Sequence, residues 1–157
     1  MLLLTMVRKS ELTNATWNEI NFSEALWTIP KERMKRRTPH LVFLSRQALD
    51  ILIALKTFSG GSSYILPSRY DSDLPMNSAT LNRVITLNYI LAQKESKPLA
   101  KFGPHDLRRT ASTLLHEAGY NTDWIEKCLV HEQRGVIAVY NKAEYRDQRT
   151  SSRTGLI

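Results

Sequence analysis

The sequence predicts a mainly helical domain with a small antiparallel sheet of about three strands, an α+β fold. The first observation is a helical period of apolar residues in three segments, from Arg46 to about Lys56, from Ser78 to about Gln93, and from Leu107 to Ala118. The second is the concentration of bulky β-prone residues between Thr16 and Leu44. A length of 157 residues and a hydrophobic content of 42% fit one domain with a real core.

The N-terminus opens on the apolar run MLLLTMV, residues 1–7. This run is too short for a signal sequence or a membrane span, and Arg8 interrupts it, so we expect the end of a buried helix. No helix start precedes the run. Residues 8–13 suit a short helix or turn.

Three strand-like segments follow, at residues 16–22, 26–30 and 41–44. The first two are joined by residues 21–25, which suit a hairpin connection. Residues 31–40 form a basic loop before the third strand. These segments predict the small sheet.

The middle helices begin at recognisable caps, Ser45 for the first and Asn77 or Ser78 for the second. Between them, the segment SGGSS at residues 59–63 has the composition of a flexible loop. We expect the inward-facing positions to be Leu49, Leu52, Ile53 and Leu55 in the first helix and Leu81, Val84, Ile85 and Tyr89 in the second.

The last two helices are expected at residues 104–118 and 123–130. Gly119 stands where a C-terminal capping glycine belongs. Residues 141–157 are polar and charged and predict a mobile C-terminal tail. The apolar stripe expected to face inward in the first of these helices consists of Leu107, Ala111, Leu114, Leu115 and Ala118.

Charge and cysteine content narrow the function classes. The net charge of +7 and pI near 9.7 favour an anionic partner, with nucleic acid first. Cys128 is the only cysteine, which excludes an intrachain disulfide, and its helical apolar neighbours predict a buried thiol. The four histidines show no metal-ligand spacing with this cysteine, so we expect no zinc site. We therefore expect a soluble cytoplasmic protein that does not contact membranes.

Four residues near the C-terminus form an ordered set: His105, Arg108, His131 and Tyr140. His105 and Arg108 are three residues apart and therefore neighbours on a helix. Cations and hydrogen-bond donors can hold a phosphate, and a phenol can attack it. The set therefore fits phosphoryl transfer without a metal.

These four residues resemble the C-terminal signature of the tyrosine recombinases, the phage-integrase family. Arg8 in TMVRKSEL and Lys35 in ERMKRRTPH stand where that family has its first arginine and its hairpin lysine. The resemblance covers nearly the whole chain and looks nearest to prophage and genomic-island integrases. It implies a helical catalytic domain that cleaves and rejoins double-stranded DNA through a 3′-phosphotyrosine, without metal or ATP. In this family a helix and a separate N-terminal DNA-binding domain precede the catalytic domain, so we expect a domain truncated at its N-terminus. It also implies a homotetramer on DNA and weak self-association in solution.

The resemblance assigns a role to each matching residue. Arg8 and Arg108 clamp the non-bridging oxygens, because arginine offers a planar fork that stays charged. His105 donates to the phosphate or helps to take the tyrosine proton, since imidazole exchanges protons near neutral pH. His131 is a second donor. Lys35 protonates the departing 5′ oxygen.

Several supporting assignments carry alternatives. Lys31 competes with Lys35, because the register of the basic loop is open. Tyr145 competes with Tyr140, but five helical residues turn by about 140°, so both tyrosines cannot face one phosphate. Glu11 is expected to orient Arg8 or to be an ordinary surface residue. The expected DNA contacts are Arg33, Arg36, Arg37 and Arg109.

The chain departs from the family pattern at three places. Met6 stands where the family usually has glycine, Phe43 where it often has proline, and Leu-Val-His131 replaces Leu-Gly-His or Leu-Ala-His. These are changes of shape near the site and not losses of chemical groups.

Two other functions remain open on the sequence. One is a DNA-binding remnant of an integrase that lacks recombination activity. The other is a basic regulator that uses residues 105–118 and 121–130 as a helix-turn-helix. The second leaves the spacing of nine residues between His131 and Tyr140 unexplained.

Overall fold

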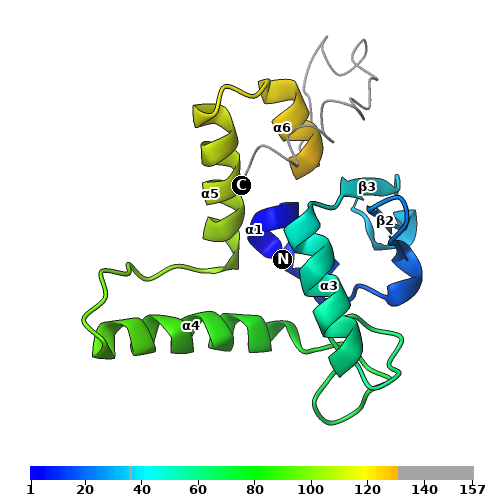
Figure 1. Cartoon of the computed structure of the whole chain (residues 1–157), viewed down its shortest axis with the longest axis horizontal. Helices are drawn as coiled ribbons and strands as arrows, with labels where there is room; N and C mark the ends of the chain where they lie inside the picture. The colour runs from blue at the N-terminus through cyan, green and yellow to red at the C-terminus, as the bar shows by residue number, and fades with distance from the viewer. Residues whose placement is uncertain (36, 131–157) are drawn as a thin grey trace.

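The computed structural model describes residues 1–35 and 37–130 (Figure 1). It confirms the predicted fold class, a mainly helical domain with a three-stranded antiparallel sheet. The helices are α1 Leu2–Thr5, α2 Lys9–Thr13, α3 Arg46–Phe58, α4 Ser78–Lys94, α5 Pro104–Glu117 and α6 Thr122–Leu129. The strands are β1 Ile20–Asn21, β2 Leu26–Ile29 and β3 His40–Phe43, with 3-10 helices η1 Trp17–Glu19 and η2 Lys31–Arg33.

The sheet has the strand order β1-β2-β3, and both pairings are antiparallel. Ile20 pairs with Trp27, and Ile29 pairs with His40. Alternate residues of β2 are buried, as expected for a sheet with one face on the core. The main hydrophobic core joins this face to the inner side of α3, and its members include Trp27, Ile29, Val42, Leu44, Ala48 and Leu52.

The first predicted strand is much shorter than expected. Residues 17–19 form η1, and only Ile20 and Asn21 join the sheet. Thr16 bonds locally to the side chains of Asn18 and Glu19, and the Trp17 amide donates to the Ser63 carbonyl. Such local side-chain bonds offer the backbone an alternative to a strand ladder.

The helix caps follow the sequence. Ser45 accepts a hydrogen bond from the amide of Ala48, and Asn77 accepts one from the amide of Ala79. Asn121 begins α6 in the same way. Gly119 has φ +80°, so it ends α5 in the left-handed region where glycine is favoured.

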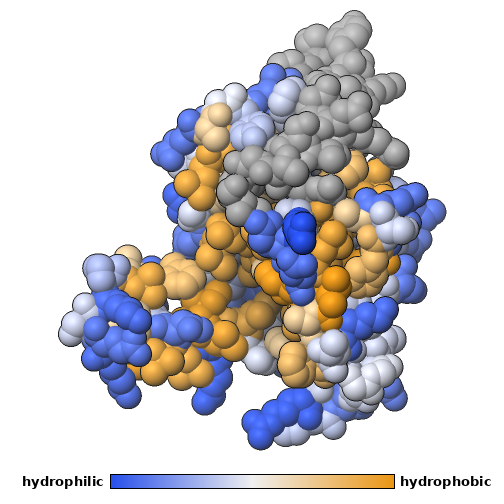
Figure 2. Space-filling model, viewed as in Figure 1, coloured by the Kyte–Doolittle hydropathy of each residue, from blue (hydrophilic) through white to orange (hydrophobic). Residues whose placement is uncertain are grey.

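Helix α4 extends away from the body of the domain (Figure 1). Of the four positions expected to face inward, Ile85 is buried, Leu81 packs against the main core and Tyr89 is partly buried. The prediction was wrong for Val84, which is 46% exposed. In the space-filling view, apolar surface lies exposed along this arm (Figure 2).

The buried face of α5 also differs from the predicted stripe. Arg108, Ala111 and Leu115 are buried, whereas Leu114 is 44% exposed. This face packs against Met6 and against α6 in a second small core that also contains Ile125 and Leu129, with Cys128 partly buried beside it. Ala111 and Leu115 keep their predicted inward positions and Leu107 packs against the main core, while Arg108 is buried as well because two backbone carbonyls accept hydrogen bonds from it.

Within residues 1–35 and 37–130, the helices are too short or too polar to cross a membrane.

Candidate active site

Arg8 is placed by the turn between α1 and α2. It occupies the N-cap of α2, and its amide donates to Glu11 Oε2 at 2.6 Å. Its guanidinium Nη1 donates to Glu11 Oε1 at 2.8 Å. Glu11 is buried, whereas the Arg8 side chain is 42% exposed. A buried carboxylate thus holds a guanidinium whose other face is open to solvent.

The turn before Arg8 depends on Met6, which has φ +53° in the left-handed region. Glycine adopts this region at no steric cost, which gives a physical reason for the glycine expected there. The Met6 side chain is buried in the second core. Burial of this side chain offsets the backbone strain.

Arg108 is 5% exposed and lies on α5. Its Nη1 donates to the Met6 carbonyl and its Nη2 to the Leu129 carbonyl, so the guanidinium links α5 to the end of α1 and the end of α6. Burial, and secondly the neighbouring charge of Arg8, lower the pKa of Arg108 from its ordinary value. It remains a cation, because arginine begins far above neutral pH.

The chain brings Arg8, His105 and Arg108 together around one pocket of about 400 Å³. His105 is the second residue of α5 and is exposed, so its ring is accessible at the pocket wall. Two cations and an imidazole at one concavity can bind a phosphate diester and stabilise added negative charge on its oxygens.

Three further polar residues line this pocket and were not predicted: Lys9, Ser10 and Asn82. Lys9 Nζ donates to Asn82 Oδ1 at 3.3 Å, which connects α2 with the α4 arm. Lys9 and Ser10 could have been found from their position next to Arg8. No feature of the sequence marks Asn82, because only the fold brings it to Lys9.

The basic loop lies elsewhere. Lys35 is exposed, and it is not part of the lining that the described residues form around the pocket. Arg37 is exposed, with φ +53°. Arg109 is 75% exposed on the outer face of α5, with Asp106 3.6 Å away, an arrangement that leaves it accessible to a DNA backbone.

Arg33 differs from the expectation of a DNA contact. Its guanidinium donates to the carbonyls of Glu11 and Asn14 and to the carboxylate of Glu19. These bonds point it into the protein. Arg36, His131, Tyr140, the competing Tyr145 and the tail at 141–157 lie outside the described residues.

Solved structures of low sequence identity share this fold. The chain matches the XerA recombinase with a TM-score of 0.69 at 21% identity, covering 97% of this chain and 56% of that one. It matches the Tn1549 transposon integrase, solved in complex with a circular intermediate DNA, with a TM-score of 0.74 at 16% identity, covering 98% and 56%. The fold therefore matches that of tyrosine recombinase catalytic domains.

A family model described as the phage integrase family matches residues 1–147. The chain is 40% identical over 148 residues to prophage integrase IntA of Escherichia coli K12, covering 94% of this chain and 34% of IntA. It is 41% identical over 151 residues to prophage integrase IntZ of the same strain, covering 95% and 35%. The integrase of enterobacteria phage P4 is 33% identical over 163 residues, with 94% and 36% covered.

The chain therefore belongs to the phage integrase family, whose members are site-specific recombination proteins. It spans about a third of the length of these curated relatives.

Proposed function

We propose that this chain is the catalytic domain of a site-specific DNA recombinase that cleaves and rejoins DNA through a 3′-phosphotyrosine. The observation that carries the proposal is the pocket shared by Arg8, His105 and Arg108. These residues come from opposite ends of the described chain, and they are the three described residues that the family resemblance assigns to the phosphate.

In the proposed cleavage step, the Tyr140 oxygen attacks phosphorus and the bond from phosphorus to the 5′ oxygen breaks. His105 accepts the phenolic proton, and Lys35 gives a proton to the departing oxygen. Arg8 and Arg108 neutralise the non-bridging oxygens. Each Nη of Arg108 makes one bond to a backbone carbonyl, which leaves a second proton on each nitrogen for the phosphate. Attack by a 5′-hydroxyl on the phosphotyrosine reverses the step, so neither metal nor ATP is needed.

His131 is proposed as a further donor to the same phosphate. The Leu129 carbonyl that accepts from Arg108 lies only two residues before it in the chain. This closeness in the sequence to a hydrogen-bond partner of Arg108 supports the proposal.

Double-stranded DNA is the proposed partner, bound by a homotetramer. The net charge of +7 and the exposed Arg37 and Arg109 support it, with Arg36 as a further proposed contact. The related Tn1549 integrase was solved in complex with DNA. Such binding weakens steeply with salt because counterions are released. A protein acting on bacterial DNA belongs in the cytoplasm.

The test is a covalent adduct on nicked suicide DNA. A random-sequence pool of nicked duplexes is incubated with the chain, and DNA that stays attached under denaturing conditions is recovered and sequenced. Cleavage next to the nick releases a short fragment, so religation fails and the adduct accumulates. We expect an adduct for the unchanged chain and for Tyr145→Phe, and none for Tyr140→Phe, which loses only the nucleophilic oxygen.

Equal DNA binding by the two variants is the control. Loss of the adduct in Tyr145→Phe and its retention in Tyr140→Phe would reassign the nucleophile. DNA binding without any adduct would instead favour a recombination-inactive remnant.

A further inference from the structure

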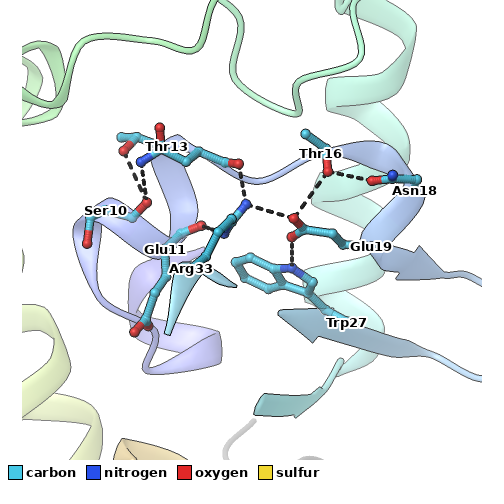
Figure 3. Close-up of polar contacts among 9 residues, drawn as sticks. Ser10, Glu11, Thr13, Thr16, Asn18, Glu19, Trp27 and Arg33 are labelled. Atoms are coloured by element: carbon cyan, nitrogen blue, oxygen red, sulfur yellow. Dashed lines mark hydrogen bonds and ion pairs between the residues drawn. The ribbon is translucent and has the colours of Figure 1, made fainter. Parts of the chain in front are cut away.

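Arg33 lies at the centre of a polar network between α2, η1 and β2 (Figure 3). Its Nη1 donates to the Asn14 carbonyl and, at 2.8 Å, to Glu19 Oε1, and its Nη2 donates to the Glu11 carbonyl at 2.5 Å. The side chain is 21% exposed. This guanidinium therefore joins three segments of the protein by hydrogen bonds.

The network is anchored to the sheet through Glu19. Glu19 Oε2 accepts from the indole Nε1 of Trp27 at 2.9 Å, and Trp27 is fully buried in β2. Thr16 Oγ1 lies 3.2 Å from Glu19 Oε1. The carboxylate that faces Arg33 is therefore fixed, and it is 8% exposed.

Glu11 connects this network to the pocket lined by Arg8, His105 and Arg108. Its backbone carbonyl accepts from Arg33, while its carboxylate holds the guanidinium and the amide of Arg8. Glu11 is thus a hydrogen-bond partner of both Arg33 and Arg8. Through Glu11, η2 is linked to Arg8 in the pocket.

Met34 and Lys35, the two residues after Arg33, show which segment these hydrogen bonds hold in place. Met34 is 4% exposed in the main core. The Met34 amide donates to the Lys31 carbonyl, and the Arg37 amide donates to the Met34 carbonyl. The chain is therefore fixed at positions 33 and 34, and Lys35, the next residue, is exposed.

We propose that Arg33 is a positioning residue for the general acid, holding the segment that presents Lys35 at a set distance from Arg8 through Glu11. This inference rests on the proposed function, in which Lys35 protonates the 5′ oxygen. Arg33 acts through the placement of Lys35 and makes no contact with DNA.

A substrate with sulfur in place of the bridging 5′ oxygen isolates this role. In that substrate the tyrosine oxygen still bonds to phosphorus and the bond from phosphorus to sulfur breaks. The leaving thiolate carries the electron pair and needs no proton, because a thiol has a pKa of about 8.5, far below that of an alcohol. A defect in proton donation disappears with sulfur, whereas a defect in folding, DNA binding or phosphate clamping persists.

The experiment compares single-turnover adduct formation by the whole chain on matched oxygen and sulfur suicide duplexes, at the site mapped with the unchanged chain. Arg33→Met and Lys35→Ala are each expected to slow the oxygen substrate by on the order of 10²-fold, since a small misplacement of a catalytic group costs about that much. Both should react with the sulfur substrate within about threefold of the unchanged chain. Glu32→Gln, an exposed neighbour, should match the unchanged chain on both.

Glu19→Gln is the second variant in case Arg33→Met does not fold, because it keeps the volume and the acceptor for Trp27 and removes only the charge that faces Arg33. It should show a smaller loss on oxygen and the same recovery on sulfur. The positioning role would be overturned if the Arg33 and Glu19 variants lost equal rates of adduct formation on both substrates while Lys35→Ala recovered on sulfur. That result would leave the proposed function standing. Failure of Lys35→Ala to recover would remove Lys35 as general acid, and this inference with it.

Discussion

Replacement of Arg108 by lysine tests whether this arginine stabilises the fold in addition to its proposed role at the phosphate. The Arg108 guanidinium donates to two backbone carbonyls, of Met6 and Leu129, and it is 5% exposed. A lysine ammonium is a single point and cannot reproduce a fork between two carbonyls. At least one charge-assisted hydrogen bond is lost, which costs about 1.5–3 kcal/mol.

We therefore expect urea denaturation to show that Arg108→Lys lowers the free energy of unfolding by about 2–3 kcal/mol. This is a large part of the total free energy of unfolding of a typical protein, which is about 5–15 kcal/mol. For a chain of this size the melting temperature should fall by roughly 4–12 °C. Arg109→Lys is the matched control, because that side chain is 75% exposed and its ion pair with Asp106 is 3.6 Å long. It should change stability by less than about 0.5 kcal/mol.

Arg8→Lys separates the two roles of the pocket arginines. The Arg8 side chain is 42% exposed, so its replacement should cost less than about 1 kcal/mol of stability while it strongly reduces adduct formation. If Arg108→Lys proved as stable as Arg109→Lys, the carbonyl contacts of Arg108 would not contribute to the fold. The burial of Arg108 would then need another explanation.

Two further predictions concern the segment around Arg8. Glu11→Gln should lower the free energy of unfolding by about 1 kcal/mol, since it weakens the cap of α2, and it should slow adduct formation about tenfold by releasing Arg8. The control is Glu24→Gln, because Glu24 is exposed. Equal rates of adduct formation for the two variants would contradict the orienting role of Glu11. Met6→Gly relieves a left-handed backbone worth about 1 kcal/mol but removes a buried side chain worth about 2–5 kcal/mol, so urea denaturation should show a net loss of about 1–4 kcal/mol. A more stable glycine variant would show that the strain at Met6 outweighs its packing.

Most of the helices could be predicted because their signals are local. Ser45 and Asn77 are capping residues followed by apolar residues at helical spacing, and both caps form as expected. Gly119 ends α5 for an equally local reason. The strand predicted at 16–22 rests on the strand propensity of Trp17 and Ile20. Residues 17–19 stay outside the sheet as η1, because the Thr16 hydroxyl donates to Asn18 and the Trp17 amide donates to the Ser63 carbonyl.

Part of the site was also predictable. Arg8, His105 and Arg108 were chosen from their spacing and their resemblance to a family, and the fold places all three at one pocket. The orientation of α5 was not predictable, because a polarity pattern assigns an arginine to the solvent side. Arg108 is buried only because two distant segments present carbonyls to it. The internal hydrogen bonds of Arg33 were not predictable for the same reason, since the fold alone brings its partners together.

The buried Arg108 and the partly buried Arg33 act on the same short segment of chain. Arg108 binds the Met6 carbonyl, two residues before Arg8, and Arg33 binds the Glu11 carbonyl, three residues after it. Arg8 therefore lies on a stretch of backbone that is held at both ends by guanidinium groups from elsewhere in the fold, and the Glu11 carboxylate fixes its side chain between them. Hydrogen bonds of this kind exist before any ligand arrives. In the proposed reaction, the phosphate would therefore meet a cation already in place, which is the condition under which charged groups stabilise a transition state most effectively.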